Sequence, residues 1–262
     1  MPEPLTAVAA GLAVLGSKDI LTKLLGPSAD YIGGEMAGLI EKCNINLDNI
    51  FIKANTKLGS RVEEPGSVSP RILRHIIDDG RFCEDELAAE YYGGMLAASR
   101  EETGKDDQCL PYLSKVKQMS IYQIRVHFAF YYQLLKLHKN SGFNLGLGSD
   151  LSKAGLYLPH EFILNIFPSD KSDDYWDLMS HSVAGLNSHG LINTYVYGDL
   201  ETINKKFPNA NDGGVYLEPN FTGAELFLWA LGGHIPNGHK FFNEKIDAIE
   251  LVIPIQDTAM AK

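Results

Sequence analysis

The chain has 262 residues, of which 45% are hydrophobic, and a formal net charge of -10 at pH 7. This length and composition suffice for one or two domains with a sizeable core, and they exclude a largely disordered chain. The acidic balance argues against non-specific adhesion to polyanions such as DNA. Its three cysteines, Cys43, Cys83 and Cys109, are odd in number and far apart, which supports neither a disulfide framework nor a zinc knuckle and fits a reducing compartment.

The first residues favour a cytoplasmic location. Glu3 stands where a signal peptide would carry Lys or Arg, so export is not expected. The longest apolar run, residues 7–16, covers about half of the roughly 20 residues that a membrane-spanning helix needs. A single transmembrane helix is therefore not expected.

Residues 5–42 are predicted to form two helices interrupted at Gly26-Pro27, because proline suits the first turn of a helix and disfavours helix in the residue before it. The second helix carries small side chains four residues apart: Ala29, Gly33 and Ala37. Helices approach closely along such a ridge, so we expect it to pack within a bundle or a homo-oligomer. Small-residue ridges also serve helix association in lipid, which makes conditional membrane association the alternative.

Two helices and a turn between residues 69 and 96 are predicted to form an αα-hairpin. Ser69 and Pro70 suit the start of the first helix, and Gly80 suits its end. Three acidic residues, Glu84, Asp85 and Glu86, load the first turn of the second helix, as its dipole favours. A charged, glycine-containing linker over residues 99–107 follows. It marks the expected boundary between an N-terminal helical region, residues 1–104, and a second domain, residues 105–262.

A local basic surface is predicted at the start of the second domain. A short helix over residues 110–116 precedes a long one, which begins with a capping box of Ser120 and Gln123 and continues to about residue 139. No Asp or Glu occurs from residue 108 to 149, while five cations do: Lys115, Lys117, Arg125, Lys136 and Lys139. Aromatic side chains among them could stack on single-stranded nucleic acid. The simpler interpretation places the aromatic rings in the core and the cations on a solvated face.

The segment from residue 172 to 233 is predicted as helix, strand, loop, strand, helix, after a further short helix over residues 156–167. An apolar stripe runs at helical spacing through Tyr175, Met179, Val183 and Leu186, and Gly190 suits a left-handed cap. Residues 191–197 are expected to pair with residues 214–217. Thr222 and Glu225 suit a capping box for the final helix.

A helix closed by a β-hairpin is typical of winged-helix domains. The expected fold is therefore mainly α, with an N-terminal helical region, a C-terminal winged-helix-like domain with a small β-hairpin, and a β-like run over residues 249–255. Three carboxylates, Asp173, Asp174 and Asp177, open the helix that would enter the DNA groove, and they oppose phosphate binding. This favours a protein-interaction module over a nucleic-acid-binding regulator, with weak nucleic-acid binding at most.

No local motif of a catalytic, metal or cofactor site is present. The closest histidine pair is His234 and His239, whose nearby carboxylates are Glu244 and Asp247, and this spacing does not favour zinc. No cofactor is expected. An enzyme of unfamiliar type stays an alternative, because a catalytic site assembled from distant residues leaves no local motif.

The order of these segments resembles the abortive-infection alpha (Abi-alpha) family of bacterial proteins, which is associated by name with phage defence. The resemblance covers roughly residues 20–232. It is carried by LLGPSADYIGGEMAGLIEK, VSPRILRHIIDDGRFCEDELAAEYYGGMLAAS, CLPYLSKVKQMSIYQIRVH, VAGLNSHGLI and YLEPNFTGAELFLWAL. Two departures are Ser120-Ile121, which lacks the usual proline, and His189-Gly190 in place of Leu-Gly.

The resemblance implies a fold and a biological setting, and it brings no catalytic residue. It implies an antiviral-defence protein that acts through protein contacts or conditional membrane association. The expected partners are a second copy of the chain and a phage or host protein.

Overall fold

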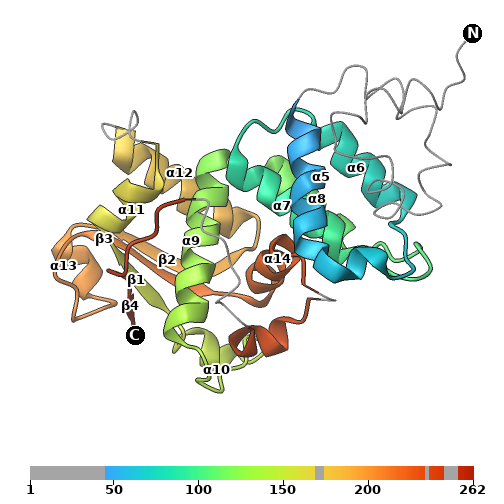
Figure 1. Ribbon diagram of the computed structural model, residues 1–262. Coiled ribbons are helices and arrows are strands. Elements are labelled where there is room, and N and C mark those ends of the chain that lie inside the picture. The colour runs from blue at the N-terminus through green and yellow to red at the C-terminus, as the bar shows by residue number, and fades with distance from the viewer. Residues whose placement is uncertain (1–44, 169–173, 234–235, 245–252) are drawn as a thin grey trace, which may run out of the picture. The chain divides into compact units, whose positions relative to one another are not determined.

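Figure 1 shows the computed structural model, which describes residues 45–168, 174–233, 236–244 and 253–262. The described part is mainly helical with a small four-stranded antiparallel sheet, which confirms the expected mainly α class. Contacts divide it into two compact units. The first contains the described residues up to Gln118 and a short segment that begins at Trp229, and the second contains the remainder. The expected boundary between residues 104 and 105 stays a prediction.

The first unit is built from helices. They are α5 (Ile45–Leu58), the 3-10 helix η1 (Gly59–Glu63), α6 (Pro70–Gly80), α7 (Glu86–Ala98) and α8 (Leu110–Gln118). The predicted αα-hairpin is confirmed by α6 and α7. Pro70 occupies the first turn of α6, and Asp85 caps α7 by accepting a hydrogen bond from the backbone N–H of Ala88 at 3.0 Å.

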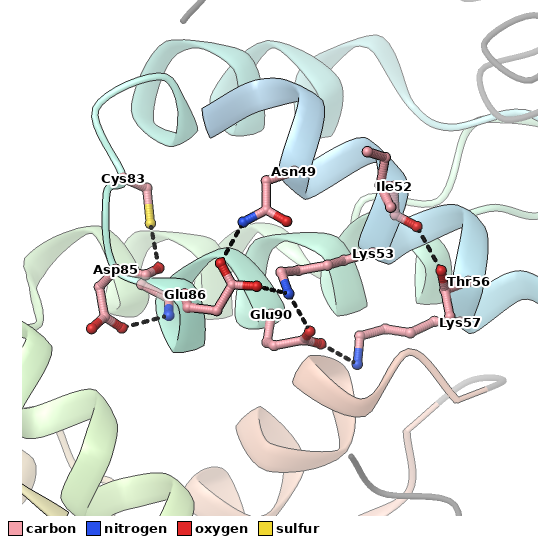
Figure 2. A network of polar contacts seen from close by, with 10 residues as sticks. Asn49, Ile52, Lys53, Thr56, Lys57, Cys83, Asp85, Glu86 and Glu90 are labelled. Carbon is pink, nitrogen blue, oxygen red and sulfur yellow. Dashed lines mark hydrogen bonds and ion pairs between the residues drawn. The ribbon is translucent and has the colours of Figure 1, made fainter. Parts of the chain in front are cut away.

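Helix α7 is the core of this unit, with every residue from Leu87 to Ala98 buried except Glu90. Gly93 lets α5 approach it closely, because a Cβ at this position would lie 2.8 Å from the Cβ of Lys53. A ladder of ion pairs runs along the same contact (Figure 2). Lys53 Nζ lies 2.5 Å from Glu86 and 2.6 Å from Glu90, and Lys57 Nζ lies 2.8 Å from Glu90. These ion pairs join α5 to α7, with Lys53, Lys57 and Glu90 largely shielded from solvent and Glu86 exposed.

The second unit contains the sheet. Its strands are β1 (Leu156–Pro159), β2 (Ile192–Gly198), β3 (Gly214–Pro219) and β4 (Met260–Ala261), in the order β2-β3-β1-β4 (Figure 1). The predicted pairing of the two hairpin strands is confirmed, since Tyr195 lies opposite Leu217 and Tyr197 lies opposite Val215. Tyr157 and Tyr216 lie on one face of the sheet. The segment between β2 and β3, which contains α13, packs on that face.

The helices of the second unit surround this sheet. They are α9 (Ile121–Leu137), α10 (Gly148–Leu151), α11 (His160–Ile166), α12 (Tyr175–Ser188), α13 (Leu200–Asn204), α14 (Phe221–Leu231) and the 3-10 helix η3 (Gly238–Asn243); the residues of α14 from Trp229 onward group with the first unit. The predicted capping box of Ser120 and Gln123 is confirmed at the start of α9. Gly190, with φ of 65°, follows α12 in the predicted left-handed conformation.

Three local predictions are wrong. Residues 156–159 form strand β1 and not a helix, because the residue before Pro159 is biased away from the helical region and α11 begins only at His160. The cap of α14 is Asn220, which accepts from the N–H of Gly223 at 2.8 Å, so Thr222 lies inside the first turn. Residues 253–255 form no strand, and the last strand lies at β4 instead; residues 249–252 lie outside the described ranges.

Candidate interaction surface

Helix α12 and strand β2 together form an outward-facing surface of aromatic and polar side chains. We call it the α12–β2 surface and define it by Trp176, Asp177 and Ser180 on α12 and by Tyr195 and Tyr197 on β2. The apolar stripe of α12 is buried as predicted, and this burial turns the remaining side chains of the helix outward. The exposed fraction of Trp176 is 46% and that of Tyr197 is 37%.

The geometry of the two elements places these side chains together. Trp176 and Ser180 are four residues apart and therefore share one face of α12. The hydroxyl groups of Ser180 and Tyr197 are hydrogen-bonded at 2.9 Å. Tyr195 and Tyr197 share one face of β2, with parallel rings whose centroids are 6.2 Å apart. This face is partly accessible to a partner, because Tyr197 is exposed and Tyr195 is partly exposed.

Polar contacts fix α12 on both sides. Next to the strand, Asn187 donates from its side-chain amide to the carbonyl oxygens of Ile192 and Asn193 at 3.4 and 3.3 Å. Next to α9, His181 Nε2 lies 3.0 Å from Ser120 Oγ, within the capping box. The α12–β2 surface is thus held in place before any partner binds.

The ring of Trp176 is positioned by its neighbours. Its centroid lies 5.1 Å from that of Tyr175 and 5.9 Å from that of His160, and the His160 and Tyr175 rings are 4.0 Å apart. Burial raises the pKa of Tyr175 above its ordinary value, so this tyrosine stays neutral at physiological pH. An aromatic side chain that is fixed and exposed loses little conformational entropy on binding.

The charge of this region is negative. No Lys or Arg occurs from residue 172 to 204, while five carboxylates do: Asp173, Asp174, Asp177, Asp199 and Glu201. Of these, Asp174 and Asp177 are exposed on the first turn of α12 or directly before it. Asp199 caps α13 through the N–H of Thr202, and this hydrogen bond lowers the pKa of its carboxyl group. On the α12–β2 surface itself the carboxylate is Asp177, which favours cations over phosphate groups.

The five cations of the predicted basic surface are divided between the units. Lys115 and Lys117 lie on α8, Arg125 and Lys136 lie on α9, and Lys139 follows α9. Lys117 Nζ lies 2.7 Å from Asp79, and Lys136 Nζ lies 2.5 Å from Asp257. Arg125 donates to the carbonyl oxygen of Ile166 at 3.1 Å. Nucleic-acid binding by these residues stays a prediction.

The aromatic side chains interleaved with these cations lie partly in the core. Phe128 and Tyr131 are buried, and the Tyr131 hydroxyl donates to the carbonyl oxygen of Leu191 at 2.6 Å. These two rings cannot stack on bases. This agrees with the simpler interpretation, which places these aromatic rings in the core.

The small-residue ridge of Ala29, Gly33 and Ala37 lies outside the described residues, as does His234. Within the described ranges, no group of three or more His, Cys, Asp or Glu side chains could hold a metal ion. None of the helices described is both long and apolar enough to cross a membrane.

The α12–β2 surface was not predicted from the sequence, although two signals for it exist. Trp176 lies outside the helical spacing of the apolar stripe of α12. This position predicts that its aromatic side chain is not part of the core. Tyr195 and Tyr197 alternate with Thr194 and Val196, so they lie on one face of the strand. Which face would be accessible depends on which segments pack on the sheet.

Comparisons with models of protein families, with curated proteins and with solved structures find no significant match.

Proposed function

We propose that this chain is a bacterial abortive-infection protein that acts in the cytoplasm through contacts with another protein and not through a catalytic site. The resemblance to the Abi-alpha family supports the setting of phage defence. The observation that carries the mode of action is the α12–β2 surface, where Trp176, Tyr195 and Tyr197 lie on two adjoining elements that contain no Lys or Arg. Trp and Tyr are enriched at protein interfaces and dominate their binding energy.

The second unit acts, in this proposal, as a winged-helix module. The order α9, β1, α11, α12, β2, β3 supports it, with β1 paired to β3 so that a helix, a strand and two helices precede a hairpin. In winged-helix proteins that read DNA, the helix before the hairpin enters the major groove. Helix α12 takes that place here, and its carboxylates favour a protein partner.

The first part of the chain supplies self-association in this proposal. The ridge of Ala29, Gly33 and Ala37 suits close packing between copies of one helix, and light scattering of the purified chain would show a dimer or larger oligomer. The same ridge would support conditional association with a membrane after a phage trigger. A strict monomer in solution would contradict the self-association.

The test is protection of bacteria against phage. Cells that express the intact chain should show fewer plaques than cells with an empty vector, and the double variant Trp176→Ala, Tyr197→Ala should lose this protection. Phe82→Ala is the matched control, because Phe82 is an aromatic side chain with an exposed fraction of 73% in the first unit. Equal loss in the control, or no protection by the intact chain against a broad phage panel, would contradict the proposal.

A further inference from the structure

We infer that the α12–β2 surface binds an arginine-rich segment of a partner protein, with guanidinium groups stacked on the rings of Trp176 and Tyr197. This inference rests on the proposed role of that surface in protein contacts. It adds the chemistry of the partner, which the surface itself specifies through its aromatic rings and its charge.

The aromatic side chains provide the contact area. Trp176 lies on α12, Tyr197 lies on β2 and Leu200 begins α13. All three side chains are large and exposed. The hydroxyl of Tyr197 is already hydrogen-bonded to Ser180, which holds the ring in place and leaves its exposed part for a ligand. A planar guanidinium stacks on such rings better than an ammonium group does, and Trp is the best acceptor of a cation.

The charges specify the sign of the partner. Trp176 lies four residues and Asp177 three residues before Ser180, so these two exposed side chains both flank Ser180 at the start of α12. A guanidinium that stacks on the indole ring can therefore also meet a carboxylate. Neither α12 nor β2 contains a Lys or Arg that would repel this cation. The α12–β2 surface supplies both aromatic rings and a carboxylate for a cationic side chain.

A nucleic acid does not fit the same surface. Single-stranded nucleic acids also stack on aromatic rings, but the proteins that bind them line the groove with cations that contact phosphates. The one charged residue on α12 and β2 is the carboxylate Asp177, and it would lie beside those phosphates. The observations therefore favour a protein segment.

The direct test is binding of a fluorescein-labelled peptide of alternating arginine and glycine, followed by fluorescence anisotropy at low ionic strength. We expect saturable binding that is tighter than that of the matching lysine–glycine peptide, and none by a glutamate–glycine peptide. Shielding of tryptophan from acrylamide should accompany it. The chain has two tryptophans, and Trp229 is buried, so quenching reports Trp176.

Variants locate the site. We expect Trp176→Ala and Asp177→Asn each to weaken binding about two- to fivefold, the size of an exposed cation–π contact, while Trp176→Phe retains most of the affinity. Glu102→Gln is the matched control for charge, because Glu102 is an exposed carboxylate of the first unit. Circular dichroism checks that each variant is folded.

Two results would overturn the inference. One is an equal loss of affinity in Glu102→Gln and Asp177→Asn, which would mean that the peptide follows net charge alone. The other is tighter binding of a single-stranded oligonucleotide that displaces the peptide at the same salt concentration.

The proposed function can fail separately. Peptide binding that requires Trp176, together with phage protection that does not, would leave this inference standing and reject the proposed role of the surface. Protection that requires Trp176 without any peptide binding would do the reverse.

Discussion

His127 is a buried ionisable side chain whose protonation opposes folding. It lies within α9 with no exposed surface, and its Nε2–H donates to the carbonyl oxygen of Gly223 at 3.1 Å. Burial lowers the pKa of this histidine from its ordinary value of 6.5 to about 3. Between these two values the unfolded chain binds a proton that the folded chain does not. The stability due to neutral His127 is therefore complete above pH 6.5 and lost as the pH falls toward 3.

We expect the free energy of unfolding to fall by up to ~1.4 kcal/mol per pH unit below pH 6.5 on account of His127 alone. Urea unfolding between pH 6.5 and 4.5 measures this slope. His127→Gln keeps an N–H donor for Gly223 and removes the titration, so its slope should be shallower. Part of the slope should remain in this variant, since burial also lowers the pKa of His138. An unchanged slope in His127→Gln would contradict the assignment.

At the scale of elements, Gly185 determines how closely α12 approaches α9. A Cβ at this position would lie 1.9 Å from Nε2 of Gln123, whose Oε1 accepts from the N–H of Ser120 in the capping box. We therefore expect Gly185→Ala to displace Gln123, weaken the cap of α9 and lower the free energy of unfolding by about 1 to 3 kcal/mol. The midpoint of urea unfolding measures this loss.

Gly148→Ala is the matched control in the same unit. Nothing lies within 4 Å of a Cβ added at Gly148, and Gly148 begins α10, so alanine should be neutral or slightly stabilising there. If Gly185→Ala unfolds at the same urea concentration as the intact chain, the approach of α12 to α9 does not depend on this glycine.

The elements that could be predicted from the sequence are those determined by nearby residues. The capping box determines the start of α9, the apolar stripe determines the buried face of α12, and Gly190 determines where α12 ends. Each signal lies in or next to the helix that it determines. Strand β1 could not be predicted, because it is four residues long and its pairing partner β3 follows more than 50 residues later. The choice between Asn220 and Thr222 as a cap depends on where the backbone leaves β3, which is a tertiary property.

The candidate site escaped sequence analysis for the same reason. Strand alternation places Tyr195 and Tyr197 on one face, but which face stays accessible depends on the tertiary packing, which places Val196 against the cluster of Ile203 and Phe207 on the other face. Conversely, the cations of the predicted basic surface on α8 and α9 are evident in the sequence. The carboxylates that pair with two of them cannot be recognised there. Asp79 precedes Lys117 by 38 residues, and Asp257 follows Lys136 by 121 residues. Local charge counts overlook such partners.

At the scale of the whole molecule, we expect a net charge of -10 and these ion pairs together to limit nucleic-acid binding. Five phosphate contacts would give a slope of log affinity against log salt of about -3.5 for single strands and -4.5 for duplex DNA. Because Lys117 and Lys136 are engaged by Asp79 and Asp257, we expect weak binding with a shallower slope, measured by anisotropy of a labelled oligonucleotide. Asp79→Asn and Asp257→Asn should each release one lysine, raise the affinity and steepen the slope, whereas Glu102→Gln should steepen it less. Sequence-specific binding that persists at high salt would contradict this expectation and favour a winged-helix regulator instead.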